Sequence, residues 1–268
     1  MTAIHPSAII EPGAQIGAHV RMGAYCVVGP NVVLGDNVAL HSHVVLDGYT
    51  SIGEGCEIYP FASIGTAPQD LKFAGEKSVL KIGKRNRIRE HVTMNPGTAS
   101  GNMETVVGDD NLFMVGVHIA HDCRIGSHVI MANNATLGGH VTVGDHAVIG
   151  GLAAVHQFVR IGAYAFIGGM SGITADVIPY GMAIGNRATL CGLNIVGLKR
   201  KGFPREQIHE LRQAYRLLFA SEGTLKERLE DVDGMFPANP LVKQVIEFIK
   251  IQSDRSFCVP NNAATPNR

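Results

Sequence analysis

The chain lacks several features that mark common classes of protein. It contains no tryptophan, its positive and negative side chains balance at 23 each, and its five cysteines have no CxxC spacing. A balanced charge argues against a general nucleic-acid-binding protein. No apolar run approaches the roughly 20 residues of a membrane span, and no basic region followed by an apolar run marks a secretory signal. We therefore expect a cytoplasmic protein with no membrane span and no nucleic-acid partner.

What the sequence does contain is a six-residue repeat. From Val107 to Ile173, a large apolar residue stands at every sixth position, a smaller one follows four residues later, and glycine often comes directly after the apolar residue. The same repeat runs from Ile4 to Ile64. An α-helix and a plain strand have other periods, whereas a hexapeptide period is typical of a parallel β-helix.

Three hexads form one triangular coil of such a helix, so residues eighteen apart lie stacked, about 4.8 Å from each other. The large apolar residues fill the interior. Cys26, Cys56 and Cys123 fall on the small inward positions, which suits reduced, buried thiols. We expect the repeat glycines to form the turns by adopting a positive φ. Because one coil buries little apolar surface alone, the stack must be long.

The repeat lapses twice before it ends. Polar stretches at 66–81 and 95–106 predict loops that leave the wall, either as tolerated surface insertions or as functional loops. We expect a β-helical domain over 1–190, a helical domain over 191–258 and a disordered tail over 259–268.

Helical signals dominate the second domain. After a basic turn at 197–204, Pro204 suits the first position of a helix. Thr224 and Glu227 form a capping-box pattern for a second helix. The Asn239–Pro240 pair predicts the start of a last helix.

The eighteen-residue rule brings polar residues from separate hexads to one corner of the coil. His121 stacks beneath Gly139, and Asp122 stacks beneath His140. The members of this corner cluster are His118, His121, Asp122, Gly139, His140, His156 and Gln157. In so repetitive a scaffold, a polar cluster along one corner is a candidate site.

The corner cluster has three possible interpretations, of which the first is structural and the second is a metal site. Each histidine taken alone is best explained as a packed or hydrogen-bonded surface residue, as in a non-catalytic scaffold. A zinc site, as in carbonic anhydrases built on this kind of helix, needs three imidazoles converging at about 2.0–2.1 Å. The positions stacked above His118 and His121 hold Thr136 and Gly139. The ligand set is therefore incomplete, and we expect no metal.

The third interpretation is acyl transfer to a hydroxyl or an amine. A neutral His121 would take the proton of the acceptor, and Asp122 would orient the imidazole or stabilise its cation. The Gly139 N–H, with no side chain in the way, suits a developing oxyanion. No Ser or Cys stands beside the cluster as an obvious nucleophile, which favours direct transfer over a covalent intermediate.

Five runs of the sequence carry a family resemblance: Ile119–Cys123, Ala132–Leu137, Gly139–Val141, Ala154–Phe158 and Gly197–Arg200. They resemble the acyl-carrier-protein–UDP-N-acetylglucosamine O-acyltransferases, which catalyse the first step of lipid A synthesis, and the similarity covers nearly the whole chain. The resemblance implies a left-handed parallel β-helix with a small C-terminal helical domain. It also implies a homotrimer with active sites in the clefts between subunits. The implied reaction moves a 3-hydroxyacyl chain from acyl carrier protein to the 3-position of UDP-N-acetylglucosamine. No cofactor is expected beyond the phosphopantetheine thioester of the donor.

The resemblance assigns roles to individual residues. His121 matches the general base of the family, and the Gly139 N–H matches its oxyanion donor. Gly169 and Met170 match the end of the groove that measures the acyl chain. Substrate-binding positions are expected at Asp70, Leu71, Lys72, His118, His140, His156, Gln157, Asn194 and Arg200.

Two segments depart from the family pattern. Asn95–Thr98 replaces a sequence that is often His-Arg-Gly-Thr, and Val196 stands where Glu is frequent. The first departure leaves the choice between a 3-hydroxyl and a 3-amino acceptor open. The basic segment 199–201 suits an acidic carrier protein.

Two other activities remain alternatives. One is the related N-acyltransferase of the same pathway, which has an extra N-terminal domain, whereas these hexads start at Ile4. The other is a CoA-dependent acetyltransferase.

Overall fold

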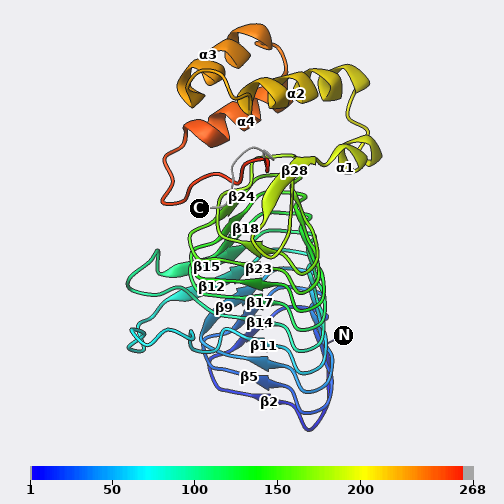
Figure 1. Cartoon of the computed structure of the whole chain (residues 1–268). Coiled ribbons are helices and arrows are strands. Elements are labelled where there is room, and N and C mark those ends of the chain that lie inside the picture. The colour runs from blue at the N-terminus through cyan, green and yellow to red at the C-terminus, as the bar shows by residue number, and fades with distance from the viewer. Residues whose placement is uncertain (1, 262–268) are drawn as a thin grey trace.

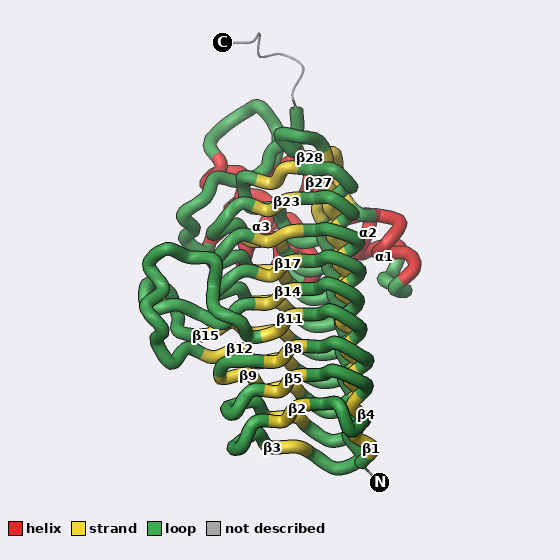
Figure 2. Tube along the Cα trace, turned by 90° about the horizontal axis from the view of Figure 1, so that it is seen from below, coloured by secondary structure: helices red, strands yellow, loops and turns green. Residues whose placement is uncertain are grey.

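Three long parallel sheets wrap around one core in the computed structural model, which describes residues 2–261. Successive short strands enter the three sheets in turn, so each coil contributes one strand to each sheet. The coils stack into a left-handed parallel β-helix, and the helices sit at its C-terminal end (Figure 1). Figure 2 shows the strands of each sheet aligned in columns along the stack.

The strands are short and regular. The eleven-stranded sheet contains β1 (Ala3–Ile4), β4 (Arg21–Met22), β7 (Ala39–Leu40), β10 (Glu57–Ile58), β13 (Arg87–Ile88), β16 (Leu112–Phe113), β19 (Ile130–Met131), β22 (Val148–Ile149), β25 (Phe166–Ile167), β27 (Gly181–Ile184) and β28 (Thr189–Leu193). The nine-stranded sheet contains β2 (Ile9–Ile10), β5 (Val27–Val28), β8 (Val45–Leu46), β11 (Ser63–Ile64), β14 (Thr93–Met94), β17 (His118–Ile119), β20 (Thr136–Leu137), β23 (Ala154–Val155) and β26 (Gly172–Ile173). The eight-stranded sheet contains β3 (Gln15–Ile16), β6 (Val33–Leu34), β9 (Tyr49–Ile52), β12 (Val79–Ile82), β15 (Glu104–Val107), β18 (Arg124–Ile125), β21 (Thr142–Val143) and β24 (Arg160–Ile161).

The strand register follows the predicted stacking. Ile119 pairs with Leu137, which pairs with Val155, so the offset from coil to coil is eighteen residues. The large apolar residues of the hexads point inward and form one continuous core. Cys26, Cys56 and Cys123 are fully buried in this core as free thiols, as predicted. Burial raises the pKa of Cys123 to about 12.

Apart from Gly65, whose φ is 84°, the repeat glycines do not adopt a positive φ, so the prediction is wrong for the others. Asp122, His140 and Phe158 hold the left-handed conformation at successive turns instead, with φ of 59°, 63° and 65°. Glycine is needed at its own repeat position because the next coil lies too close for a side chain. A Cβ at Gly144 would lie 2.5 Å from the backbone N of Ala163.

Two loops leave the wall on one side, and they are drawn in cyan and teal in Figure 1. The first joins β11 to β12, and the second joins β14 to β15. Because β12 begins at Val79 and β15 at Glu104, both loops end earlier than the predicted stretches 66–81 and 95–106.

The hexad pattern gives way to an antiparallel pair, β27 with β28, at the end of the stack. The helices α1 (Ile195–Arg200), α2 (Arg205–Leu218), α3 (Leu225–Met235) and α4 (Pro240–Lys250) follow. Among residues 2–261, no helix is long and apolar enough to cross a membrane.

The helix starts agree with the capping signals, with two exceptions. The capping box of Thr224 and Glu227 is present, and Asn239 caps α4 directly before Pro240. The predicted basic turn at 197–204 is wrong in its first half, because α1 extends to Arg200. Pro204 is the N-cap of α2 and not its first residue.

The chain beyond α4 returns to the β-helix. Val259, which falls in the predicted tail 259–268, accepts a hydrogen bond from the backbone N–H of Leu190 at 3.0 Å. Residues 262–268 of the predicted tail lie outside the residues that the structure describes.

Candidate active site

His121 and Asp122 form a hydrogen-bonded pair at the corner between β17 and β18. The Nδ1 of His121 lies 2.8 Å from Oδ2 of Asp122, and the Asp122 side chain is fully buried. A carboxylate only accepts hydrogen bonds, so the His121 Nδ1 carries the proton. The Nε2 of a neutral His121 is therefore free to accept a proton.

The second loop holds Asp122 in place. The hydroxyl of Thr98 donates to Oδ2 at 2.7 Å, and the Thr98 and Asn102 backbone N–H groups donate at 3.1 and 2.8 Å. Burial alone would raise the pKa of Asp122, but the hydrogen bonds from Thr98 and His121 outweigh it and lower the pKa. This carboxylate is thus kept ionised beside the imidazole.

Gly139 lies directly against the His121 ring. A Cβ at this position would come within 2.5 Å of Cε1 and 2.6 Å of Nε2 of His121. The backbone N–H of His140 donates to the His121 carbonyl at 3.0 Å, which joins the two coils. Among the hydrogen bonds of residues 2–261, none has the Gly139 N–H as its donor. The N–H that the stacking rule selected is therefore available beside the imidazole.

Two further histidines flank this pair. The His140 ring meets the His121 ring edge-on, with centroids 5.1 Å apart, and stacks on Phe158 at 4.3 Å. His118 contacts the Thr93 hydroxyl through Nδ1 at 2.7 Å. Burial lowers the pKa of both His118 and His140, and the nearby His121 lowers them further. Asp122, 3.9 Å from His140, opposes the shift there. Both rings favour the neutral form.

A metal could in geometry alone be held by His121, Asp122 and His140, whose ligand atoms lie within 4.8 Å of one another. The Asp122 Oδ2 already accepts hydrogen bonds from Thr98, and the His121 Nδ1 already donates to it. These contacts suit an acid–base pair better than a ligand set. The absence of a metal stays a prediction.

The sequence is similar to known proteins over almost its full length. A family model described as UDP-N-acetylglucosamine O-acyltransferase, domain 2, matches residues 176–258, and the bacterial transferase hexapeptide model matches 1–35 and 104–139. An acyl-(acyl-carrier-protein)–UDP-N-acetylglucosamine O-acyltransferase of Agrobacterium fabrum is 48% identical over 96% of this chain and 96% of its own. One of Caulobacter vibrioides is 55% identical over 80% and 82%. The chain belongs to this family of O-acyltransferases.

Solved structures agree with this assignment. The UDP-N-acetylglucosamine O-acyltransferase of Moraxella catarrhalis superposes with a TM-score of 0.92 at 44% identity, covering 95% of this chain and 99% of its own. The Francisella novicida acyltransferase gives the same TM-score at 36% identity and covers 99% of both chains. This O-acyltransferase therefore shares both the β-helix and the helical domain of its relatives.

Only some of the other substrate-binding residues predicted for the O-acyltransferase lie near the corner cluster. Asp70 is in the first loop, close enough that its charge favours protonation of His140. Its carboxylate accepts the Lys72 N–H at 3.0 Å, and the Leu71 side chain is fully exposed. His156 and Gln157 lie at the same corner, at the start of the turn between β23 and β24.

Asn194 and Arg200 lie on a different face from His121. They line a cavity of about 540 Å³ with Ile130, Val148 and other residues of the eleven-stranded sheet, whereas His121 lies between the nine- and eight-stranded sheets. The Asn194 side chain also caps α1 by accepting the Gly197 N–H at 3.0 Å. Within a single chain, Asn194 and Arg200 therefore do not lie at the corner cluster.

Gly169 and Met170, predicted to form the end of the groove that measures the acyl chain, follow β25 near the end of the stack. Met170 is about three-quarters exposed. A Cβ at Gly169 would lie 3.2 Å from the Gly151 carbonyl oxygen, and no other atom lies within 3.4 Å. Both residues therefore border open space. Their role at the end of the groove that measures the acyl chain stays a prediction.

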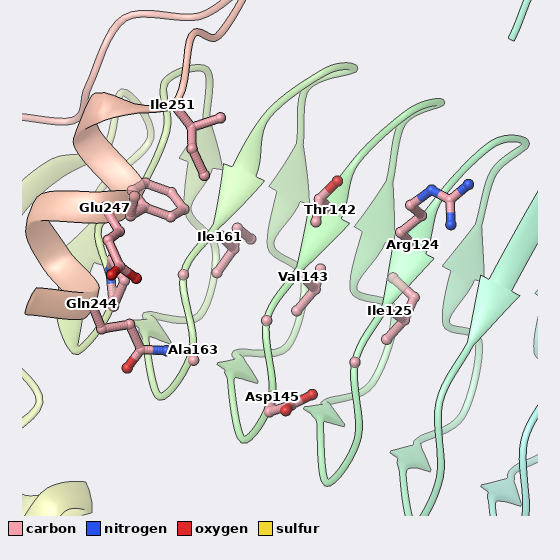
Figure 3. A pocket seen from close by; sticks show the side chains of 15 residues that line it. Arg124, Ile125, Thr142, Val143, Asp145, Ile161, Ala163, Gln244, Glu247 and Ile251 are labelled. Atoms are coloured by element: carbon pink, nitrogen blue, oxygen red, sulfur yellow. The ribbon is translucent and has the colours of Figure 1, made fainter. Parts of the chain in front are cut away.

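A further cavity of about 510 Å³ lies between the eight-stranded sheet and α4. Figure 3 shows Ile125, Val143 and Ile161 on the sheet side, with Gln244 and Glu247 on the helix. None of these residues belongs to the corner cluster.

Thr98 and Arg255 are among the residues that contact the corner cluster without having been predicted to do so. The sequence marks Thr98 only as part of a segment that departs from the family pattern, yet its hydroxyl donates to Asp122. Arg255 lies near the end of the chain and contacts both His156 and Gln157. Neither residue lies on a hexad, so the eighteen-residue rule could not place them.

Proposed function

We propose that this O-acyltransferase moves a 3-hydroxyacyl chain from acyl carrier protein to the 3-position of UDP-N-acetylglucosamine, the first step of lipid A synthesis. Curated relatives carry both substrates in their names, at 46–58% identity. The contact of His121 with Asp122 on one side and Gly139 on the other is the observation that supports the chemistry most.

The reaction needs one proton acceptor and one oxyanion donor. The Nε2 of His121 takes the proton from the sugar hydroxyl while the hydroxyl oxygen attacks the thioester carbonyl. The carbonyl oxygen, now negative, accepts the Gly139 N–H. The tetrahedral intermediate collapses, the C–S bond breaks, and the imidazolium returns its proton to the departing thiolate. Between these two proton transfers, Asp122 stabilises the imidazolium.

Transfer is direct in this scheme. The free cysteine at the corner, Cys123, is buried, and burial keeps its thiol protonated, which supports a mechanism without an acyl-cysteine. No metal or organic cofactor takes part, and the phosphopantetheine arm arrives with the donor.

The complete site would form between subunits of a cytoplasmic homotrimer. The support is geometric: the cavity of Asn194 and Arg200 lies on one face, and His121 lies at the corner between the other two sheets. A neighbouring copy would bring its cavity to this corner. Lys199 and Arg200, in the last turn of α1, would attract an acidic carrier protein.

The acceptor atom distinguishes two forms of the proposal. Asn95 is buried and its side chain donates to the Thr66 carbonyl at 3.0 Å. Asn95, which belongs to the segment that departs from the family pattern, therefore joins the two loops. A 3-amino acceptor remains the alternative to a 3-hydroxyl.

The test is mass spectrometry of the products made from a series of acyl-carrier-protein donors of increasing length. UDP-N-acetylglucosamine and its 3-amino analogue would be offered separately. A 3-O-acyl product from the carrier-protein donors supports the proposal. Turnover with acetyl-CoA alone, or no turnover with any donor, would overturn it. Stoichiometric zinc in active protein would revive the metal alternative.

A further inference from the structure

The segment that follows α4 is fixed to the last coils of the β-helix. We call residues 251–259 the C-terminal strap. The Ser256 carbonyl accepts the Asp176 N–H, and the Cys258 N–H donates to the Asp176 carbonyl, both at 2.8 Å. Val259 is hydrogen-bonded to Leu190 at 3.0 Å. The strap thus has a defined path across the end of the stack.

Side chains hold the strap as well. The Arg160 Nε donates to the buried Asp176 carboxylate at 2.7 Å. The same guanidinium lies over the Phe248 ring at 4.4 Å and faces Phe257 of the strap at 6.0 Å. The contact of this guanidinium with both rings restrains the strap where it passes the corner cluster.

Arg255 of the strap reaches back about a hundred residues in sequence to the corner cluster. Its Nη2 lies 2.8 Å from Nδ1 of His156, and its Nε donates to the Gln157 carbonyl at 3.1 Å. A guanidinium has donors only. The His156 Nδ1 must therefore be the acceptor, and a neutral His156 carries its proton on Nε2.

Another hydrogen bond competes for the same nitrogen. The His156 Nδ1 also lies 3.3 Å from the Gln157 carbonyl oxygen. Without Arg255, a proton on Nδ1 would be satisfied by that carbonyl, which would leave Nε2 without its proton. Arg255 occupies the carbonyl and the nitrogen at the same time, and so it disfavours this tautomer.

We propose that Arg255 is a positioning residue that keeps His156 as a donor through Nε2. The His156 side chain is solvent-exposed at the corner cluster, so its Nε2–H can donate to an oxygen of a bound substrate. The chemical class recognised is an oxygen acceptor, such as an amide carbonyl of pantetheine or a phosphate of the sugar nucleotide. The tautomer claim stands on the geometry, whereas its effect on turnover rests on the proposed function.

Nuclear magnetic resonance of the full chain labelled with ¹⁵N-histidine tests the tautomer. Spectra would be recorded at about pH 8, where an ordinary imidazole is neutral, and His156→Gln would assign the signals. We expect a pyridine-like Nδ1 and a protonated Nε2 in the wild type, and a shift toward the Nδ1–H tautomer in Arg255→Ala. Ser256→Ala is the matched control, because Ser256 is exposed and contributes only its carbonyl. A wild-type spectrum with a protonated Nδ1, or no change in Arg255→Ala, would overturn the proposal.

Steady-state kinetics of the same variants test the consequence. Losing one charge-assisted hydrogen bond predicts that Arg255→Ala lowers kcat/KM about tenfold, mainly through KM. Arg255→Lys keeps a donor and should recover part of the loss, and Ser256→Ala should match the wild type. An Arg255→Ala enzyme with unchanged kinetic constants would contradict the role. If no donor and acceptor pair reacts, the proposed function fails while the spectra still decide the tautomer.

Discussion

The Thr98 hydroxyl donates to the Asp122 carboxylate across 2.7 Å, and both side chains are buried. This contact connects a loop outside the hexad repeat to the residue that orients His121. The second loop is therefore part of the support of the candidate site and not only a surface insertion.

Thr98→Val should weaken both stability and activity. The substitution removes the hydroxyl donor and leaves the shape of the side chain, so we expect the free energy of unfolding to fall by about 1–3 kcal/mol. It should also raise the pKa of Asp122, since the Thr98 hydrogen bond is one of the causes that lower it. Chemical denaturation measures the first effect and the acid side of the pH–rate profile the second. Thr98→Ser keeps the hydroxyl and serves as the control. If it loses as much stability and activity as Thr98→Val, the hydrogen bond is not the cause.

Replacing the members of the His121–Asp122 pair should lower kcat much more than it changes KM. A general base contributes about 10²–10⁴-fold, so His121→Ala should leave little turnover. Asp122→Asn should lower kcat because its amide cannot stabilise an imidazolium as a carboxylate does. Single-turnover kinetics with saturating donor and acceptor would measure the chemical step. Near-wild-type kcat in His121→Ala would show that the base is assigned wrongly.

Stability should fall as the pH drops from about 7 to 5, because burial lowers the pKa of His118 and His140 in the folded state. In the unfolded chain both imidazoles bind a proton near pH 6.5. Below that value the unfolded state binds more protons, and unfolding becomes more favourable as the pH falls. Urea denaturation at several pH values would show this dependence. His118→Gln should make it shallower, and an unchanged slope in this variant would exclude His118 as a source.

The stacking of the corner cluster could be predicted because each coil contains a fixed number of residues. Once the hexads are aligned, the position of Gly139 over His121 follows from counting. Thr98 and Arg255 could not be placed in this way, because a loop and a strap bring them to the cluster by paths that no repeat describes. The φ values of the turns were also mispredicted. Asp122 and His140 tolerate the left-handed conformation, while the glycines are required for close packing between coils.

Gly139→Ala tests whether the close approach of residue 139 to the imidazole matters. The new Cβ would lie 2.5 Å from Cε1 of His121, so the ring must move away from Asp122 or the coil must shift. We expect kcat to fall about 10²-fold, the size of effect seen when an oxyanion donor is lost or misplaced. Gly234→Ala in α3 is the matched control, because a Cβ there meets no atom within 4 Å. That change should leave activity intact and stabilise the helix by about 0.5–1 kcal/mol, since alanine favours helices over glycine. Equal activity in the two variants would mean that the Gly139 N–H and the His121 ring do not act on the same reacting group.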